Sequence, residues 1–489
     1  MIEPREQAHV IVKTDEFVAT TFWGILALLA GSAITAGLAS RGLYQDGAYY
    51  LIRMAERDWF YLVDPARTTV QILRQMPVVL LMRTSGLSLQ AYGTVFSLAM
   101  LLLPVLLAIP CWFIPPRGLR GYAIFPVFSL LLGLFTQSIE AVGEAAIATA
   151  FYWVMLFLLV FRTRGAVTQI AFVALCAAAC FLHEGAALLT TVLLAGCGCR
   201  LFASTTAQDR IFLCVSVLVL TAVLTYQIDW IVHPRVPGQS STAFQALTSF
   251  GFLARNGRIN LTVIPALAAC FVLTIMWARQ TRAAPPEGAR RVWWPVAGFA
   301  AIGAVAAFLP WTCEACIAPT AQALSRYNAL FSGLGLGFLM LYCHMAGIRP
   351  SQWTNPPALA VISILAVTQV SADAAATIRW KAYVADFAAR IATTTGLLPW
   401  ASTVESGDRI RDENWQAFSA GWVVPMLSII LAPGGKVGAI IDYPADAWRS
   451  IEPHQVDALP KIRGVDYASY RRALADDLRG GRSSNETAR

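Results

Sequence analysis

The segment that decides the fold is ATTFWGILALLAGSAITAGLAS, residues 19–40. It carries no charged side chain, and it reaches the roughly 20 apolar residues that an α-helix needs to cross the hydrocarbon of a bilayer. The run also lacks a clear small-residue cleavage site. We therefore expect a membrane-spanning helix here rather than a cleavable signal peptide.

The composition of the whole chain supports this interpretation. The 489 residues are 57% apolar and 13% charged, and the mean hydropathy is +0.58. A soluble domain carries about 25% charged residues, and water-soluble folding cannot bury this much apolar surface. The net charge of +8 comes mostly from arginines in short loops, which indicates orientation signals rather than nucleic-acid binding.

Further apolar runs of spanning length follow the first one. Together they predict an all-α polytopic membrane protein with about eleven transmembrane helices. The runs lie at 19–40, 90–113, 122–138, 144–161, 166–182, 185–203, 211–231, 259–278, 292–310, 328–347 and 356–374.

Arginines predict the orientation of these spans. Every second loop is short and basic, as in PPRGLRGY and FRTRGA, which marks those loops as cytoplasmic. Residues 1–18 are then a cytoplasmic N-terminus, and 19–374 form the transmembrane domain. The opposite, periplasmic face receives the long loops 41–89, 233–260 and 311–326, together with a C-terminal segment, 375–489.

Three features of the later chain have more than one interpretation. The run 417–432 is short for a span, and we interpret it as a buried or interfacial helix, with a twelfth span as the alternative. In the C-terminal segment, 380–399 predicts an amphipathic helix, and 437–441 predicts a short strand. The single CxxC, Cys313–Cys316, favours a disulfide or two free thiols over a zinc site, so we expect no metal.

The first outer loop is too polar to span and too apolar to be fully solvated. Its segments 46–58 and 66–83 predict two amphipathic helices on the membrane surface, because they mix aromatic side chains with arginines. Asp46 stands at the expected start of the first helix. It is either an N-cap, for which aspartate is favoured, or a general base that faces a lipid-borne substrate.

Other ionisable residues also gather at the outer ends of predicted spans. Ionisable groups near hydrocarbon are costly and tend to be functional, and their absence from the middle of most spans disfavours an ion-coupled transporter. The candidates are Glu140 and Glu144 between spans three and four, His183 and Glu184 at the end of span five, and Arg326 and Tyr327 at the start of span ten.

Five short motifs in residues 19–347 resemble the GT-C superfamily of membrane glycosyltransferases. The resemblance is to the branch of the protein O-mannosyltransferases and the lipid A aminoarabinose transferases. The motifs are DGAYYLIRMA (46–55), MPVVLLMRTSGLS (76–88), SIEAVGEAAIATAFYWVMLFLL (138–159), FLHEGA (181–186) and SRYNALF (325–331).

The resemblance implies transfer of a sugar from a polyprenyl phosphate to an envelope acceptor at the periplasmic face of a bacterial inner membrane. Asp46 would be the catalytic base, and a cation would hold the leaving phosphate. The substrate-binding residues would be Arg326, with Arg53 or Arg74 as weaker candidates, His183, Glu144 and Glu140, and the aromatic Tyr327 and Tyr50. Relatives often have two adjacent acids where this chain has Asp46–Gly47, which leaves one candidate base.

Three alternatives stay open at this point. The first is an O-antigen polymerase or ligase, although such enzymes place their long outer loop later in the chain. The second is a transporter or lipid flippase, which predicts charges near the bilayer midplane or broken helices in matching halves. The third is an inactive GT-C scaffold. The sugar, the acceptor and a dependence on divalent metal are not specified by the sequence.

Overall fold

The computed structural model of the chain describes residues 4–44, 46–134, 143–162, 165–204, 206–233, 321–350, 356–404, 406–419, 423–443 and 451–476. Residues 4–15 and 321–328 are among those described by their backbone alone. The predicted spans 259–278 and 292–310, the loop 233–260 after its first residue, Glu140 and the pair Cys313–Cys316 lie outside the described residues.

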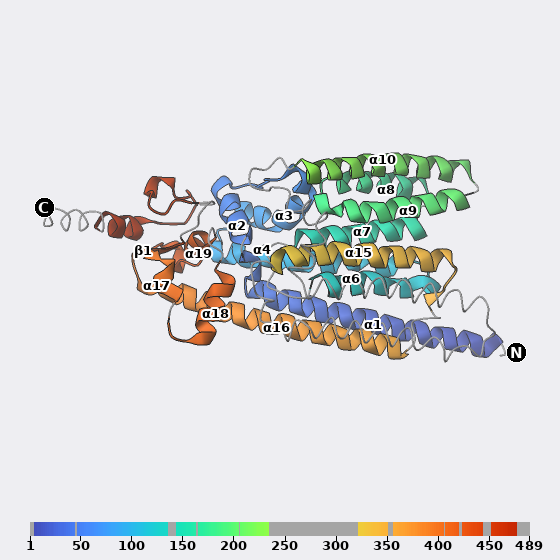
Figure 1. Cartoon of the computed structure of the whole chain (residues 1–489), viewed down its shortest axis with the longest axis horizontal. Helices are drawn as coiled ribbons and strands as arrows, with labels where there is room; N and C mark the ends of the chain where they lie inside the picture. Colours follow the sequence, from blue (N-terminus) through green and yellow to red (C-terminus); the bar gives the residue numbers. More distant parts are fainter. Residues whose placement is uncertain are drawn as a thin grey trace.

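Most of the predicted apolar runs form the helices of one elongated bundle (Figure 1). The helix α1 packs against α4 and α16, α15 packs against α6, α7 and α9, and α10 packs against α8 and α9. The bounds are α1 (Pro4–Leu38), α4 (Leu89–Ala108), α5 (Pro110–Phe113), η3 (Arg117–Ala123), α6 (Ile124–Leu134), α7 (Glu144–Phe161), α8 (Ala166–Ala179), α9 (Ala187–Ala203), α10 (Ala207–Val232), α15 (Ala321–Met345) and α16 (Pro356–Thr393).

Five segments in the described part of the chain are long and apolar enough to cross a membrane. They are Glu16–Leu38, Leu89–Phe113, Glu144–Phe161, Glu184–Phe202 and Ala207–Val232. The chain is therefore a helical membrane protein, as its composition predicts. The total of about eleven spans stays a prediction.

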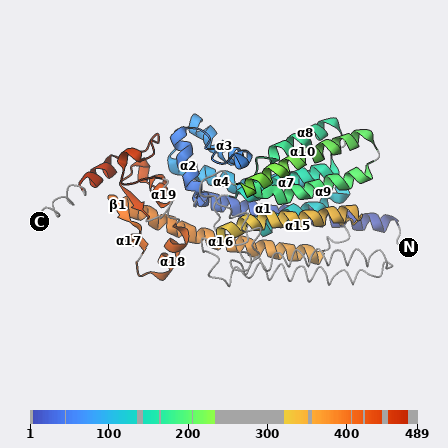
Figure 2. The ribbon, with the colours of Figure 1, turned by 45° about the horizontal axis from the view of Figure 1, so that its top comes forward.

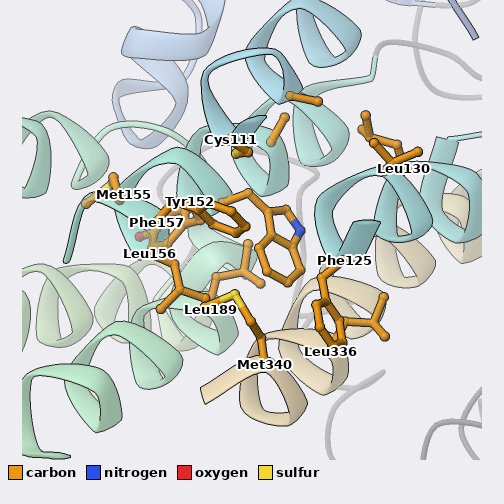
Figure 3. Packing of buried hydrophobic residues seen from close by; sticks show 14 of the residues in the cluster. Cys111, Phe125, Leu130, Tyr152, Met155, Leu156, Phe157, Leu189, Leu336 and Met340 are labelled. Carbon is orange, nitrogen blue, oxygen red and sulfur yellow. The ribbon is translucent and has the colours of Figure 1, made fainter. Parts of the chain in front are cut away.

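Close helix packing in the bundle depends on small residues of α15. A Cβ atom on Gly333 would lie 2.7 Å from Cδ2 of Leu189 in α9 and 2.8 Å from Cγ2 of Thr149 in α7. The glycine therefore lets the backbone of α15 approach both helices, as small residues do in membrane bundles. Figure 3 shows Leu156, Leu189 and Met340 meeting from these three helices within the apolar core.

The bundle also buries an uncharged polar network. The Tyr152 hydroxyl lies 2.7 Å from that of Thr190, which donates to Oε1 of Gln227 at 2.8 Å. Nε2 of Gln227 donates to the Ala179 carbonyl at 3.2 Å. Since no water is available inside hydrocarbon, these groups satisfy one another and connect α7, α9, α10 and the end of α8.

The first outer loop contains the two predicted helices, and both lie at the end of the bundle where α1 ends (Figure 1). Its elements are η1 (Arg41–Leu43), α2 (Asp46–Arg57), η2 (Pro65–Arg67) and α3 (Thr68–Thr84). The expected position of α2 on the membrane surface stays a prediction, but the apolar face of this helix is covered by protein. Half of its residues, among them Tyr50, Leu51 and Met54, are buried, and α2 packs between α4 and α19 (Val424–Ile430).

The C-terminal segment folds against the same end of the bundle (Figure 2). It shares one apolar core with α2 and α4, in which Trp380, Phe418 and Ile440 join Leu51 and Phe96. Its elements after α16 are β1 (Gly396–Pro399), α17 (Trp400–Val404), α18 (Arg409–Phe418), α19, η8 (Pro433–Gly435), β2 (Ala439–Asp442) and η9 (Val456–Ala458). The strands β1 and β2 pair in parallel, and β2 lies where the sequence predicts a strand.

Two expectations for this segment change with the structure. The helix α16 runs without a break from Pro356 to Thr393, so the predicted boundary at 374 falls inside a helix. The helix predicted for 380–399 is the second half of α16, and residues from Gly396 onward form a strand instead. The run 417–432 contains the buried α19, which is too short to cross a bilayer.

A buried ion pair fixes α16 to the segment that directly follows the C-terminal end of α1. Nη1 of Arg41 donates to Oδ1 of Asp373 at 2.6 Å, and the hydroxyl of Ser32 donates to Oδ2 at 2.5 Å. Both charged side chains are almost fully buried. About two helical turns further along α16, Nε1 of Trp380 donates to the Ala39 carbonyl at 2.9 Å.

We predict that Asp373→Ala destabilises the protein by about 3–5 kcal/mol, because Arg41 then keeps its charge in a buried position without its carboxylate. The matched control is Glu413→Ala. This substitution breaks the ion pair of Glu413, which is 48% exposed, with Arg409, which is 83% exposed. It should lower the free energy of unfolding by at most about 1 kcal/mol. Thermal unfolding of the two purified variants in lipid nanodiscs measures the difference. Equal losses of stability in the two variants would contradict a stabilising buried ion pair between Arg41 and Asp373.

Candidate functional site

Arg67 is the centre of a buried charge cluster at the end of the bundle where α2 and α3 lie. Its Nη1 donates to Oε2 of Glu144 at 2.9 Å, and its Nε donates to Oε2 of Glu184 at 2.9 Å. Nη2 of Arg67 also donates to Oε1 of Glu184, which makes this pair bidentate. The arginine thereby joins η2 to the first residue of α7 and to η4 (Glu184–Ala186).

Local structure fixes the position of Arg67. Oδ1 of Asp64 accepts a hydrogen bond from the backbone N–H of Ala66 at 2.9 Å and so caps η2, whose first residue is Pro65. Oδ2 of the same aspartate lies 3.3 Å from Nε of Arg67. The capped turn therefore both directs the arginine inward and adds a third carboxylate to the cluster.

Arg74 extends the cluster toward α2. Its Nη2 lies 2.9 Å from Oε1 of Glu144, and its side chain is fully buried. The guanidinium carbon is 4.0 Å from the centre of the Tyr50 ring, a cation–π contact. The Tyr50 hydroxyl accepts a hydrogen bond from Nε2 of Gln71 at 3.2 Å. The order of contacts is therefore Glu184, Arg67, Glu144, Arg74 and Tyr50.

Burial and neighbouring charge set the protonation of the groups in the outer loop. Burial alone would lower the pKa of Arg67, but the adjacent carboxylates of Glu184 and Glu144 outweigh it and hold that pKa well above its usual value. Burial, followed by the charge of Glu144, raises the pKa of Tyr50. Arg67 is thus always cationic, and the Tyr50 phenol is neutral at physiological pH.

Glu144 has both of its carboxylate oxygens next to arginines, Oε2 beside Arg67 and Oε1 beside Arg74. Its side chain is only 3% exposed. The carboxylate therefore lies between the two guanidinium groups and holds them in place. Direct contact of Glu144 with a sugar or phosphate therefore requires that one of these ion pairs opens.

His183 caps the turn that carries Glu184. Its Nδ1 accepts a hydrogen bond from the backbone N–H of Gly185 at 3.0 Å, which places the proton of the neutral ring on Nε2. Gly185 leaves room for a close neighbour here, since a Cβ atom would lie 2.7 Å from Cδ1 of Leu330 in α15. The turn therefore packs against the first part of α15.

The backbone of Arg326 and Tyr327 lies one helical turn before Leu330, at the same end of the bundle as Glu144. Their side chains, like all of Glu140, lie outside the described residues. Arg53 is placed differently. It donates to Oε2 of Glu56 at 2.8 Å on the partly exposed side of α2, so the structure groups Arg74, and not Arg53, with the buried cluster.

Asp46 is the first residue of α2 and is partly exposed. A carboxylate at this position is stabilised by the helix dipole. Its helix is held very tightly at this point, since a Cβ atom on Gly47 would lie 1.6 Å from the carbonyl oxygen of Gly42. A side chain at position 47, and with it a second acid beside Asp46, is therefore sterically excluded in this chain.

Three residues of the cluster, Asp64, Arg67 and Glu184, are not among the site residues that the resemblance implies, although the sequence places Glu184 with His183 at the end of a predicted span. Arg67 and Arg74 are about two helical turns apart, which indicates one shared face of the predicted helix 66–83 and could have paired them. The partners of Arg67 and Glu184 come from distant segments, and no spacing rule in the sequence reports such contacts.

In the part of the chain that the structure describes, no group of three His, Cys, Asp or Glu side chains converges to hold a metal ion. Comparison with models of protein families, with curated proteins and with solved structures finds no match to this chain.

We predict that Arg74 and Glu144 act as an energetic pair. Arg74→Met should destabilise the protein by about 3–5 kcal/mol, because it leaves a buried carboxylate with less compensation. The double variant R74M/E144Q should lose clearly less than the sum of the two single losses. Thermal unfolding in nanodiscs gives the four values of this cycle.

The control for this cycle is the partly exposed pair of Arg53 and Glu56, where Arg53→Met should cost at most about 1 kcal/mol. Strictly additive losses for R74M and E144Q would show that the two side chains do not interact.

A separate prediction concerns the start of α2. Gly47→Ala should lower the unfolding temperature by several degrees, since the methyl group overlaps the Gly42 carbonyl and overpacking costs about 1–3 kcal/mol. Gly86→Ala in the same loop is the matched control, because a Cβ atom there meets nothing within 4 Å. Equal unfolding temperatures of the two alanine variants would contradict the close contact between Gly47 and the carbonyl group of Gly42.

Proposed function

We propose that this protein is a membrane glycosyltransferase of the GT-C kind. It would move a sugar from a polyprenyl-phosphate donor to an envelope acceptor at the outer face of the membrane. The observation that carries the proposal is the convergence, at one end of a helical membrane bundle, of the Asp46 helix with a buried network of arginines and carboxylates.

The proposed chemistry needs a base and a cation. The Asp46 carboxylate accepts the proton of the acceptor hydroxyl, whose oxygen forms a bond to the anomeric carbon of the donor sugar. The bond from that carbon to the phosphate oxygen breaks, and the lipid phosphate leaves with the electron pair. A positive side chain stabilises the charge that develops on this phosphate.

The geometry around Asp46 supports its proposed role as the base, because the residue is partly exposed while its helix α2 is held by its neighbours. Asp46 and Tyr50 are one turn apart on α2, and the Tyr50 ring is fixed against Arg74. Gly42 and Gly47 fix the start of the same helix. Such support restricts the carboxylate to a narrow range of positions, as catalytic groups require.

The cation for the leaving phosphate is assigned to Arg326 in this proposal. Arg74 is engaged with Glu144 and Tyr50, and Arg53 with Glu56, which makes both less suited to bind a phosphate. The guanidinium group matches two phosphate oxygens at once. Arg326 stands in α15 near the η4 turn, at the same end of the bundle as Asp46.

The proposal includes the membrane topology. The N-terminus would be cytoplasmic in a bacterial inner membrane, the chain would have about eleven spans, and α2, α3 and the C-terminal segment would be periplasmic. This orientation follows from the arginine-rich short loops. It places Asp46 on the leaflet where a flipped lipid-linked sugar is presented.

The test compares envelope glycans and glycolipids by mass spectrometry in a deletion strain of the source organism. The deletion is complemented with wild type, Asp46→Asn or Asp58→Asn at matched protein levels. Asp58 is exposed in the same loop and has a positive φ of 51°, which asparagine also tolerates, so Asp58→Asn is the matched control.

We expect one sugar-sized mass to disappear in the deletion and to return with wild type and Asp58→Asn. Asp46→Asn should restore at most about 1% of it, because a general base contributes roughly 10²–10⁴ in rate. Full restoration by Asp46→Asn would reject Asp46 as the base. A deletion without any change in envelope sugars would reject the glycosyltransferase proposal itself.

A further inference from the structure

An apolar patch lies on the outside of the first outer loop. It is formed by Trp59, Leu62, Met76, Leu80 and Leu87, whose side chains are between 43% and 57% exposed. A group of large apolar side chains exposed together is unusual for a surface in contact with water, and such patches mark binding surfaces. The opposite face of α3, with Arg74, Gln75 and Val78, is fully buried.

The patch is held as one surface by hydrogen bonds between α3 and the segment before it. The backbone N–H of Tyr61 donates to Oε1 of Gln75 at 2.8 Å, and Nε2 of Gln75 donates to the Tyr61 carbonyl at 2.9 Å. The backbone N–H of Val63 donates to Oε1 of Gln71 at 3.2 Å. Residues 59–63 therefore run along α3, which places Trp59 and Leu62 beside it.

Two exposed arginines border the patch. The guanidinium carbon of Arg83 lies 3.9 Å from the centre of the Trp59 ring, and that of Arg57 lies 4.6 Å from the centre of the Tyr61 ring. Stacking on an aromatic ring orients a guanidinium group while its N–H donors stay available. The patch thus combines apolar side chains with oriented cations, the combination found where proteins meet lipid headgroups.

Both ends of α3 are attached to the ends of membrane helices. The backbone N–H of Thr69 donates to the Phe181 carbonyl at 2.8 Å, and its hydroxyl donates to the Ala178 carbonyl at 3.1 Å, at the end of α8. At the other end, Ser88 caps α4 by accepting from the N–H of Ala91 at 3.2 Å, and the candidate span begins at Leu89. These attachments keep α3 beside the ends of α8 and α4, and α4 is a candidate span.

We infer that this patch inserts into the adjacent lipid leaflet and binds anionic phospholipid headgroups. Trp59, Leu62, Met76 and Leu80 would enter the boundary between headgroups and acyl chains, and Arg83 and Arg57 would contact lipid phosphates. A protein partner is less suited to this surface, because the bilayer already lies next to both ends of α3. The inference does not depend on the proposed sugar transfer.

The test uses the full-length protein with photoreactive p-benzoylphenylalanine at position 80, in nanodiscs of phosphatidylcholine with and without phosphatidylglycerol. Irradiation followed by mass spectrometry identifies the lipid adducts. The same amino acid at position 218 is the positive control, because Leu218 is 71% exposed on the span α10. Position 410 is the negative control, because Ile410 is 69% exposed on α18 of the C-terminal segment.

We expect lipid adducts at positions 80 and 218 and background levels at 410. Phosphatidylglycerol should be enriched at position 80 by about fivefold relative to position 218, the factor expected for one basic residue at an anionic surface, and Arg83→Gln should remove most of this enrichment. An unchanged adduct yield at position 218 shows that the Arg83→Gln protein is folded.

Two results would overturn the inference. Adducts at position 80 that do not exceed those at position 410 would show that the patch does not touch lipid. Lipid adducts at position 80 with the same phosphatidylglycerol share as at position 218, or a share that Arg83→Gln leaves unchanged, would show that the arginines do not recognise headgroups.

Discussion

The end of the bundle that carries α2 and α3 depends on the neutralisation of the charge of Arg67. A buried guanidinium group cannot lose its proton, so its desolvation must be compensated by carboxylates within contact distance. Glu144, Glu184 and Asp64 supply that compensation from three different elements. The ion pairs thereby fix the loop that contains α2 and α3 to the start of α7 and to the turn before α9. Arg74 contacts both Glu144 and Tyr50 and so connects this cluster to α2.

A second set of contacts holds α2 from the other side. Arg41 and Trp380 attach α16 to the end of α1, and the C-terminal segment covers the apolar face of α2 with α19. The start of α2 is then restricted by the contact between Gly42 and Gly47. Asp46 is a partly exposed carboxylate on a helix that is fixed at its start, at its buried face and through Tyr50.

The sequence predicts a helix well where one local property, a long run of apolar residues, determines the structure of the segment. Apolar runs locate α1, α4, α7 and α10, because lipid requires every backbone group of a span to be paired within the helix. The burial of α2 was not predictable, since its mixture of Tyr50, Arg53 and Glu56 is equally typical of an interfacial helix. What covers it comes from residues 380–441, and chain patterns carry no information about such distant contacts. The pairing of Arg67 with Glu184 could not be predicted for the same reason. The location of Glu144 and His183 at one end of the bundle, in contrast, follows from the predicted ends of the spans.

The shared core of α2 and the C-terminal segment has a consequence for biosynthesis. The first outer loop is translated early, but its apolar partners Trp380, Phe418 and Ile440 belong to the last part of the chain. Until these residues emerge, the apolar side chains of α2 have no permanent cover. Exposed apolar surface of this kind recruits chaperones and promotes aggregation. A nascent chain that stops before α16 would therefore present its unfinished N-terminal third to the quality-control machinery of the cell, even though every span in that third had already been inserted.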